Sequence, residues 1–348
     1  MADLRALIDK LIAGESLTVE EYALLVKERT PETAARLAAA ATEKRQAIYG
    51  NTVYIRGLIE VSNICKNNCH YCGIRAGNPN CDRYRLTEED ILAACAEGYE
   101  LGFRTFVLQG GEDGHFTDER LTSLLRAIKK NHPDCAVTLS LGERTRESYE
   151  ALHEAGADRY LLRHETATKS HYEKLHPAAL SFDNRMRCLR DLREIGYQVG
   201  CGFMVGSPYQ TVDDLARDLE FISDFKPDMC GIGPFIPHKD TPFAGFSAGT
   251  VELTCYLLSI IRLIHPPVLL PATTALGTIH PEGRELGIRS GANVVMPNLS
   301  PAHARENYML YNNKLRSGAE AAQNLDDLRR RMAAIGYEVV TDRGDIQR

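Results

Sequence analysis

Apolar and polar residues follow two different patterns along the chain. In residues 1–48 the apolar side chains recur at helical spacing, as at Leu4, Ile8 and Leu11, and Thr18 begins a capping-box pattern that starts a helix. After this region, short runs of β-branched or other apolar residues alternate with amphipathic stretches. We therefore expect an N-terminal helical extension over residues 1–48, followed by a region of alternating strands and helices.

The second region predicts a closed barrel of parallel strands. Helix start signals such as Thr87 with Asp90 lie between most of the apolar runs. Eight strands alternating with helices over about 250 residues is the pattern of a (β/α)8 TIM barrel, an α/β fold, although an open doubly wound sheet fits the same alternation. The barrel is assigned to residues 49–315, and residues 316–348 are expected to form a C-terminal helical tail with a solvated end. The predicted strands are 53–60, 105–109, 136–141, 159–163, 199–205, 229–236, 268–271 and 293–296.

Polar residues and glycines gather where the predicted strands end. They occupy positions 62–72 after the first strand, 109–112 after the second, 140–143 after the third, 164–166 after the fourth and 234–238 after the sixth. The reacting groups of such barrels lie at the carboxyl ends of the strands, which all meet at one rim. We therefore expect a functional site at that rim.

Composition and charge restrict the class of protein. With 44% hydrophobic and 25% charged residues, the chain has enough apolar side chains to bury a full core. Its net charge of −6 lacks the basic excess that is typical of general nucleic-acid binders. Charges at Asp3, Arg5, Asp9 and Lys10 interrupt any signal-peptide core, and no apolar run reaches the ~18 residues of a membrane span. A cytoplasmic protein without nucleic-acid or membrane partners is expected.

Ten cysteines are the unusual feature of this composition, because proteins of a reducing compartment do not use cysteines as disulfide staples. Three of them form a C-x3-C-x2-C triplet at Cys65, Cys69 and Cys72. Three thiolates at such spacing repel one another unless a cation neutralises them, so a metal site is the simplest interpretation. The other seven have no partner spacing and are expected to be buried thiols. They are Cys81, Cys95, Cys135, Cys188, Cys201, Cys230 and Cys255.

Two kinds of metal centre fit the triplet. A structural zinc ion needs four ligands, usually in two separated pairs, and here His70 or Cys81 could supply the fourth. A [4Fe–4S] cluster held by three cysteines accounts better for the spacing and leaves one iron open for a further ligand. We expect one such cluster, with Cys65, Cys69 and Cys72 as its ligands.

The triplet, with Tyr71 before its third cysteine and a predicted strand just before its first, resembles the radical S-adenosylmethionine family. In that family the open iron of the cluster binds the amino and carboxylate groups of S-adenosylmethionine. An electron from the reduced cluster then cleaves the sulfonium, which yields methionine and a 5′-deoxyadenosyl radical. The resemblance covers nearly the whole chain and implies a barrel with a closed cavity, because such a radical has to be kept from solvent.

Longer motifs narrow the resemblance to one group. These are a glycine-rich turn at 109–113, LLRHET at 161–166, GIGPFIPH at 231–238, PATTA at 271–275 and NVVMPN at 293–298. Together they resemble the HydE group of [FeFe]-hydrogenase maturases, which lies near biotin synthase and methylornithine synthase. The resemblance implies a radical S-adenosylmethionine enzyme that acts on a small sulfur-containing precursor during maturation of the hydrogenase active site, the H-cluster. Other maturases and an electron donor such as ferredoxin or flavodoxin are the implied partners.

The same resemblance assigns roles to individual residues. Arg185 is expected to pair with the carboxylate of S-adenosylmethionine, since a planar guanidinium binds a carboxylate through two parallel hydrogen bonds. Several anion-binding groups that face one closed space imply a small, carboxylate-bearing substrate. The residues expected to contact the cofactor are Ser140, Glu165, Arg185, Tyr71, Gly110, Gly111, Glu112 and Met229. Those expected to line the substrate cavity are Arg56, Gln109, Thr138, Arg159, Arg163, Thr273, Thr274, Met296, Tyr308 and Tyr311, with Met229 again.

Other interpretations stay open for some of these residues and for the function. Thr273 and Thr274 could cap the next helix, and Tyr308 and Tyr311, three residues apart, could pack on one face of a helix. A methylornithine synthase-like mutase acting on lysine would share the barrel and the triplet. A non-catalytic iron–sulfur scaffold would share the triplet as well.

One departure from the HydE group concerns a second cluster. Many members of that group carry further cysteines in the C-terminal segment, and these hold an accessory cluster. This chain has no cysteine after Cys255. We therefore expect a single cluster and no accessory one.

Overall fold

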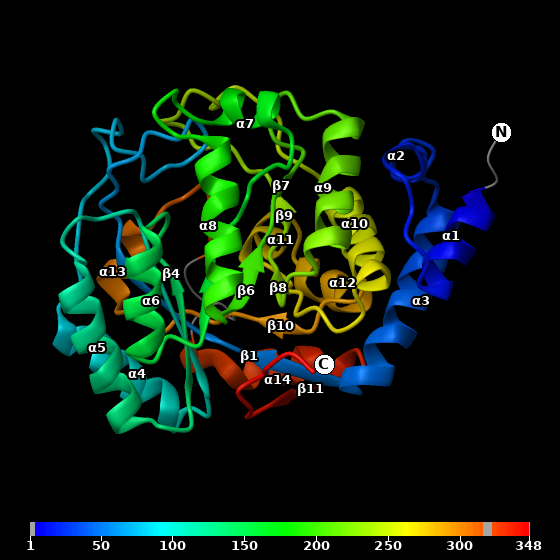
Figure 1. Cartoon of the computed structure of the whole chain (residues 1–348). Helices are drawn as coiled ribbons and strands as arrows, with labels where there is room; N and C mark the ends of the chain where they lie inside the picture. The colour runs from blue at the N-terminus through cyan, green and yellow to red at the C-terminus, as the bar shows by residue number, and fades with distance from the viewer. Residues whose placement is uncertain (1–3, 316–321, 348) are drawn as a thin grey trace.

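A ring of parallel strands forms the centre of the protein, which the computed structural model describes for residues 4–315 and 322–347 (Figure 1). The strands are β1 (Thr52–Ile55), β2 (Gly57–Ser62), β3 (Thr105–Gly110), β4 (Ala136–Ser140), β5 (Arg159–Leu161), β6 (Gln198–Cys201), β7 (Met204–Val205), β8 (Met229–Cys230), β9 (Gly233–Pro234), β10 (Val294–Val295) and β11 (Glu338–Val340).

Pairing between neighbouring strands runs all the way around this ring. Six strands form one parallel sheet in the order β2-β3-β4-β5-β6-β8. Parallel bridges between Met229 and Leu269 and between Pro271 and Val294 extend the pairing to β10, which pairs with β1. Since only Arg56 separates β1 from β2, the ring closes. The closed ring confirms the (β/α)8 barrel and excludes the open sheet.

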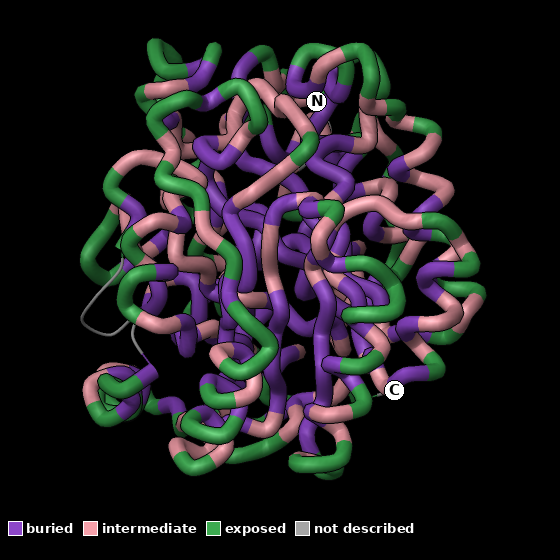
Figure 2. Tube along the Cα trace, turned by 90° about the vertical axis from the view of Figure 1, so that its left-hand side faces the viewer, coloured by how far each residue is buried: buried purple, intermediate pink, exposed green. Residues whose placement is uncertain are grey.

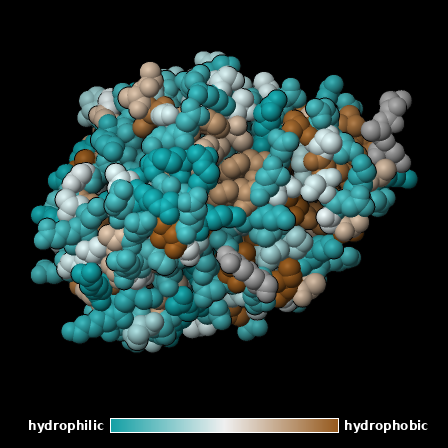
Figure 3. All heavy atoms as spheres, in the orientation of Figure 1, coloured by the Kyte–Doolittle hydropathy of each residue, from teal (hydrophilic) through white to brown (hydrophobic). Residues whose placement is uncertain are grey.

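Helices surround the ring and connect its strands (Figure 1). The helix starts predicted at Thr18 and Thr87 are present, because each threonine side chain accepts a hydrogen bond from the third residue of the helix that follows. Figure 3 shows a mostly hydrophilic outer surface, as expected of helices that bury one face only. The helices are α1 (Leu4–Ala13), α2 (Val19–Lys27), α3 (Pro31–Tyr49), α4 (Glu88–Glu100), α5 (Asp118–Asn131), α6 (Arg146–Glu154), α7 (Lys169–Leu175), α8 (Phe182–Ile195), α9 (Val212–Phe225), α10 (Val251–Ile264), α11 (Thr274–Ile279), α12 (Gly283–Arg289), α13 (Ala302–Asn307) and α14 (Leu325–Ala334), and a 3₁₀ turn spans Ala322–Asn324.

The first three helices pack together on one side of the barrel. Helix α2 lies against α9, and α3 lies against α10 and α12. The point at which an N-terminal extension gives way to the barrel stays a prediction. None of the helices in the described residues is both long enough and apolar enough to cross a membrane.

The structure divides three of the predicted strands and reduces a fourth to isolated bridges, and two of the divisions occur at glycines. Gly202 has φ 148°, and a Cβ atom there would lie 2.1 Å from the carbonyl oxygen of Gly231, so only glycine permits this close approach. Pro271 has no N–H group to donate to a ladder, and its run forms isolated bridges in place of a strand. The four predicted runs are 53–60, 199–205, 229–236 and 268–271.

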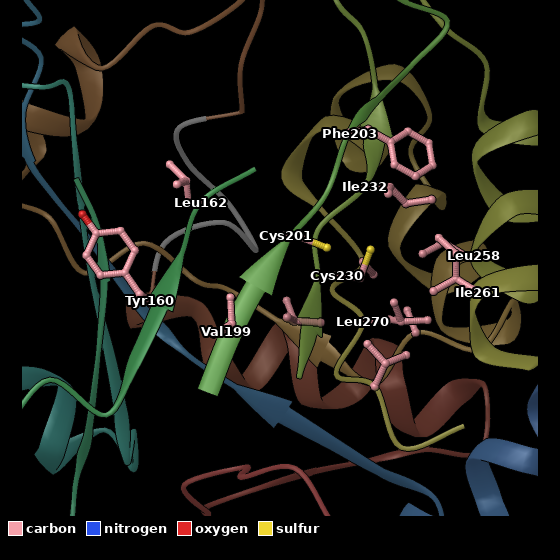
Figure 4. Packing of buried hydrophobic residues seen from close by; sticks show 14 of the residues in the cluster. Tyr160, Leu162, Val199, Cys201, Phe203, Cys230, Ile232, Leu258, Ile261 and Leu270 are labelled. Atoms are coloured by element: carbon pink, nitrogen blue, oxygen red, sulfur yellow. The ribbon is translucent and has the colours of Figure 1, made fainter. Parts of the chain in front are cut away.

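Apolar side chains fill the space between the ring and its helices. Figure 2 shows the buried residues toward the centre of the molecule and the exposed ones on its outside. Cys201 of β6 and Cys230 of β8 lie opposite each other in register, and their side chains point toward Leu258 and Ile261 of α10 (Figure 4). The expected burial of the cysteines outside the triplet is confirmed for five of them, whereas Cys81 and Cys255 are only partly buried. The five are Cys95, Cys135, Cys188, Cys201 and Cys230.

The C-terminal residues close the floor of the barrel, at the amino ends of the strands. Strand β11 adds to β1 in parallel, and the chain then continues beneath the ring. Arg159, the first residue of β5, donates from Nη2 to Oδ1 of Asp345 at 2.5 Å and to the carbonyl oxygen of Arg343 at 2.9 Å. The prediction that Arg159 lines the substrate cavity is therefore wrong, because its guanidinium group is directed to these C-terminal residues and it belongs to neither of the two cavity walls described below.

The prediction for the C-terminal tail also needs correction. A helix is present as α14, but the chain after it forms β11 and packs on the barrel floor instead of ending in solvent. Asp345, for example, also accepts a hydrogen bond from Nε2 of Gln198 at 2.9 Å. Residues 316–321, where the predicted tail begins, lie outside the described residues, and so does residue 348.

We expect the Asp345→Asn variant to unfold at a lower temperature than the unchanged protein. The substitution removes the negative charge that pairs with the fully buried Arg159. We expect the loss of this counter-charge to lower the free energy of unfolding by about 2 kcal/mol. Glu338→Gln removes an exposed acid from β11 and is the control, with a shift in melting temperature below about 1 °C. Equal melting temperatures for the two variants would contradict the role of this pair.

Candidate active site

A cavity of about 350 Å³, here called the outer cavity, opens at the carboxyl ends of the strands, the rim where the sequence predicts the site. Its walls come from the loop after β2, the ends of β3, β4 and β5, the residues around β9, and the segments 273–275 and 308–314. This volume is within the range of small-molecule sites. The predicted site residues that line it are Cys65, Cys69, Tyr71, Cys72, Gln109, Gly110, Gly111, Glu112, Ser140, Arg163, Glu165, Arg185, Thr273, Thr274, Met296, Tyr308 and Tyr311.

A smaller cavity of about 120 Å³, the inner cavity, lies deeper in the barrel. Gln109, Arg163 and Thr273 belong to the walls of both cavities, so the two adjoin. Met229 lines only the inner cavity, where its sulfur accepts a hydrogen bond from Nη1 of Arg56 at 2.7 Å. Met229 therefore lies apart from the cysteines, which corrects its assignment to the cofactor contacts. The other predicted residues in this wall are Arg56, Thr138 and Met296.

The three predicted cluster ligands face the outer cavity from the loop that follows β2. A backbone hydrogen bond of 3.0 Å from the N–H of Lys66 to the carbonyl oxygen of Glu112 ties this loop to the glycine-rich turn after β3. Loop and turn are packed so closely that a Cβ atom at Gly111 would lie 2.7 Å from Cβ of Cys65. Only glycine fits at this point. The two motifs recognised separately in the sequence thus form one wall.

The sulfur atoms of the triplet suit a soft metal centre. Burial raises the pKa of Cys69 to about 12 and raises the pKa of Cys72 as well, and the negative charge of neighbouring cysteines adds to both shifts. Thiols shifted in this way stay protonated at neutral pH unless a bound cation stabilises the thiolates. The donor set fits a [4Fe–4S] cluster, which Cys65, Cys69 and Cys72 would hold.

Neither candidate for a fourth zinc ligand belongs to the cavity wall. Nδ1 of His70 is 3.1 Å from the carbonyl oxygen of Lys174, and the sulfur of Cys81 accepts from the side-chain amide of Asn63 at 3.5 Å. Within residues 4–315 and 322–347, no three His, Cys, Asp or Glu side chains converge as they would around a single ion. The zinc alternative therefore gains no support, because a zinc ion needs its ligands around one point. In a [4Fe–4S] cluster each cysteine binds a different iron, so the three sulfur atoms can lie farther apart.

Arg185 reaches the outer cavity from the start of α8 and is held by two neighbours. Its Nε atom donates to Oε1 of Glu143 at 2.6 Å, and its Nη1 atom donates to the carbonyl oxygen of Arg163 at 2.5 Å. Glu143, which we did not assign to the site from the sequence, therefore fixes the plane of the guanidinium group. The available signal was its place in the polar run 140–143 after the third predicted strand.

Glu165 follows β5 and has a left-handed backbone conformation, with φ 65°. Such a conformation costs a non-glycine residue about 1–3 kcal/mol and is found where surrounding contacts hold a functional side chain in place. Its Oε2 atom is 3.3 Å from Nη2 of Arg163, and its negative charge contributes to the raised pKa of Cys69. Glu165 thus directs its carboxylate toward the cavity beside the triplet.

Tyr71 lies half-buried beside the triplet and is held by His176, which sequence reasoning missed. The Tyr71 hydroxyl is 3.2 Å from Nε2 of His176, and Nδ1 of the same ring is 3.0 Å from the carbonyl oxygen of Tyr172. Burial and the positive charge of Arg185 lower the pKa of His176 to about 3. The ring is therefore neutral at pH 7, donates from Nδ1 and accepts the hydrogen bond of the tyrosine at Nε2. His176 lies outside every motif, so nothing in the sequence pointed to it.

Buried hydrogen-bond donors that have no hydrogen-bond partner among the described residues line the inner cavity. They are Nε of Arg56, Nε of Arg163, and the hydroxyl groups of Thr138 and Thr273. Nη2 of Arg163 is not in this set, because Oε2 of Glu165 lies 3.3 Å from it. Buried polar groups are nearly always paired, so an unpaired set around one enclosed space indicates a ligand that accepts hydrogen bonds. Two guanidinium groups in the set favour an anion.

The structure does not support helix capping by the side chain of Thr273, nor packing of Tyr308 and Tyr311 on one helical face. Thr273 precedes α11, but its side chain accepts no capping hydrogen bond from that helix. Tyr308 follows the last residue of α13, and Tyr311 lies beyond the helix, so the two tyrosines do not share a helical face. The Tyr308 hydroxyl instead accepts from Nε2 of Gln109 at 3.4 Å, at the junction of the two cavities.

An ion pair that we did not predict is buried in the wall of the outer cavity. Lys314 donates from Nζ to Oε1 of Glu60 on β2 and to the carbonyl oxygen of Tyr308, the latter at 2.9 Å. The side chain of Glu60 is fully buried, and that of Lys314 is 7% exposed. No local pattern indicates the pair, because its members are 254 residues apart in the chain.

Comparison with known proteins gives the family. The family model of the Radical SAM superfamily matches residues 59–222. The [FeFe] hydrogenase maturase subunit HydE of Thermotoga maritima is 46% identical over 312 residues, which cover 89% of this chain and 88% of that protein. This chain belongs to the HydE family of radical SAM enzymes.

Other relatives of this HydE-family protein share its whole length. The 3-methylornithine synthase of Methanosarcina barkeri is 29% identical over 95% of this chain and 92% of that protein. The crystal structure of methylornithine synthase (PylB) superimposes with a TM-score of 0.83 at 29% identity, over 96% of this chain and 97% of that one. HydG, a maturase of the [FeFe]-hydrogenase, superimposes with a TM-score of 0.80 at 21% identity over 96% of this chain and 75% of that one, which supports the fold alone.

Membership of the HydE family implies two ligands for the outer cavity, a [4Fe–4S] cluster and S-adenosylmethionine. The structure brings the cysteine triplet, the glycine-rich turn, Ser140, Glu165 and Arg185 together around one space. Which of these residues touches which ligand stays a prediction.

The Cys69→Ser variant of this HydE-family protein is expected to lose the cluster, because a hydroxyl is a much poorer ligand for iron than a thiolate. After anaerobic reconstitution, the iron content should fall from about four atoms per chain to near zero. Cys81→Ser is the matched control, since Cys81 lies in the same loop outside the cavity wall, and this variant should keep its iron. Retention of iron in Cys69→Ser would contradict the ligand assignment.

Arg185→Lys is expected to weaken binding of S-adenosylmethionine about tenfold, because an ammonium group cannot reproduce the orientation that Glu143 gives the guanidinium. Equilibrium binding to the reconstituted protein measures the change. Arg187→Lys, on the same helix and paired with Asp191, is the control and should bind normally. The iron content of both variants should stay unchanged, and its loss in Arg185→Lys would refute a role in cofactor binding.

Proposed function

We propose that this enzyme acts in assembly of the [FeFe]-hydrogenase active site, on a small, anionic, sulfur-containing precursor. The observation that carries the proposal is the pair of adjoining cavities, with the cysteine triplet facing the outer one and unpaired donors lining the inner one. A molecule held in the inner cavity lies next to a cofactor held in the outer cavity. The 46% identity to HydE of Thermotoga maritima supports the same assignment.

The residues of the outer cavity bind and orient the cofactor in this proposal. When bound, the reduced cluster supplies the electron for cleavage of S-adenosylmethionine into methionine and a 5′-deoxyadenosyl radical. Arg185, oriented by Glu143, pairs with the carboxylate of the cofactor, and Ser140 and Glu165 contact its ribose or methionyl part. The glycine-rich turn brings its backbone close to the amino group. Because these groups lie at the mouth of a closed barrel, they also keep water from the reacting atoms.

The residues of the inner cavity select the substrate. Arg56 supplies a positive charge, Arg163 adds an Nε donor while its Nη2 pairs with Glu165, and Thr138 and Thr273 supply hydroxyl donors. A space of about 120 Å³ admits only a small molecule or one end of a larger one. We therefore assign to this cavity the anionic group of the precursor.

We further propose a single [4Fe–4S] cluster per chain, held by Cys65, Cys69 and Cys72. The support for this number is the distribution of thiols, since the last cysteine is Cys255 on α10, outside both cavity walls. The partners in the proposal are other hydrogenase maturases and an electron donor such as ferredoxin or flavodoxin, in the cytoplasm.

A second candidate function is a methylornithine synthase-like mutase that acts on lysine. The similarity to methylornithine synthase, with a TM-score of 0.83, is the observation that favours it. A substrate with free ammonium groups requires acidic partners in the cavity, but Glu60, the most deeply buried acid of the wall, is already paired with Lys314. We therefore prefer the anionic precursor over the mutase substrate and over a non-catalytic scaffold.

Anaerobic reconstitution distinguishes the three candidates. With dithionite and S-adenosylmethionine, the protein should form 5′-deoxyadenosine, and it should restore hydrogenase activity to a maturation mixture that lacks its HydE component. Cys69→Ser should do neither and serves as the control. Binding of iron without cleavage would indicate a scaffold, and consumption of lysine without restored hydrogenase activity would indicate the mutase.

A further inference from the structure

The acidic side chains that line the outer cavity are each paired with a cation of the chain itself. The cation of one pair is open to solvent, since Lys66 is 67% exposed. Arg163 is 33% exposed as a side chain, although its Nη2 atom, which faces Glu165, is buried. Only in the third pair are both side chains buried. The pairs are Glu112 with Lys66 at 3.2 Å, Glu165 with Arg163 at 3.3 Å, and Glu60 with Lys314.

Backbone hydrogen bonds join the segment before Lys314 to both sides of the cavity mouth, and they hold the lysine beside Glu60. The carbonyl oxygen of Leu310 accepts from the N–H of Gly73 in the cysteine loop at 2.8 Å, and the N–H of Asn312 donates to the carbonyl oxygen of Pro237 at 3.0 Å. The ammonium group of Lys314 also lies 4.7 Å from the centre of the Tyr308 ring. Lys314 is thus a fixed part of the wall.

Glu60 depends on this cation. Burial raises the pKa of its carboxyl group, and the positive charge of Lys314 opposes that shift. Its second oxygen, Oε2, is buried and has no hydrogen bond of good geometry within the described residues. Removal of one member of a buried ion pair leaves an uncompensated charge, so a Glu60 without Lys314 would attract any ammonium group of suitable size. The wall therefore contains an acid, Glu60, that can bind an ammonium group, and the ammonium group of Lys314 already occupies it.

We infer that Lys314 determines the charge class of the substrate. By occupying Glu60 it closes the cavity to molecules that are recognised through a free ammonium group, and it leaves the unpaired donors of the inner cavity to select an anion. The inference rests on the proposed function, since it explains how a barrel shared with methylornithine synthase acts on a different class of molecule. Lys314 is in this respect a specificity-determining residue.

Chemical rescue tests the inference. The Lys314→Ala variant lacks three methylene groups and the ammonium, and n-propylammonium has the size and charge of what is missing. In reconstituted protein with S-adenosylmethionine, n-propylammonium chloride should raise the melting temperature of Lys314→Ala by about 2 °C or more over an equal concentration of sodium chloride. The unchanged protein should show no such rise.

Two variants serve as controls. The double variant Glu60→Gln with Lys314→Ala should lose the rescue, because no carboxylate remains to attract the ammonium. Lys66→Ala, which removes the solvent-exposed partner of Glu112, should show no rescue either, because water and salt screen a pair whose cation is 67% exposed, and Glu112 keeps the hydrogen bond that it accepts from the N–H of Glu143. If Lys314→Ala does not fold, its refolding yield in n-propylammonium chloride is compared with its refolding yield in an equal concentration of sodium chloride.

Two results would overturn the inference. One is stabilisation of the unchanged protein by n-propylammonium or by lysine, which would show that an external ammonium group displaces Lys314. The other is absence of rescue in folded Lys314→Ala. Neither readout uses hydrogenase maturation or cofactor cleavage, so failure here leaves the proposed function standing, and failure of the maturation assay leaves the rescue result valid.

Discussion

Charged side chains inside a closed ring of strands have to be paired within the ring, because the interior cannot solvate them. Three such pairs, at the floor, in the wall and at the rim of the barrel, join segments that lie far apart in the chain. Around the inner cavity, buried donors such as Nε of Arg56 have no hydrogen-bond partner among the described residues, as expected of the wall of a binding site. The three pairs are Arg159 with Asp345, Glu60 with Lys314, and Arg185 with Glu143.

The cysteine triplet depends on contacts outside its own loop. Gly111 lets the turn after β3 approach Cys65 closely, and His176 accepts the hydroxyl proton of Tyr71 in a hydrogen bond. Buried thiols at this spacing are unfavourable as thiolates until a cation binds, so the loop has to be held in position by its neighbours. The arrangement places the three thiols together in the wall of the outer cavity.

The relation to methylornithine synthase is one of fold, which the two chains share over nearly their whole length with a TM-score of 0.83. We infer that a few charges in the wall decide the chemistry of the pocket. The ammonium group of Lys314 occupies Glu60, and buried donors of Arg56, Thr138 and Thr273, which have no hydrogen-bond partner among the described residues, suit an anion.

Local patterns in the sequence by themselves determined the class of fold, the metal-binding triplet and the family. Periodicity, helix caps and ligand spacing relate residues only a few positions apart, so they are visible without a structure. The short range of these patterns also explains the wrong strand predictions. In the sequence, Gly202 fits within one strand over 199–205, but its close contact with Gly231 divides that strand. Only the tertiary structure decided which charges meet across the barrel. Lys314 reaches Glu60 across 254 residues and Asp345 reaches Arg159 across 186, and such contacts exist only once the ring has closed.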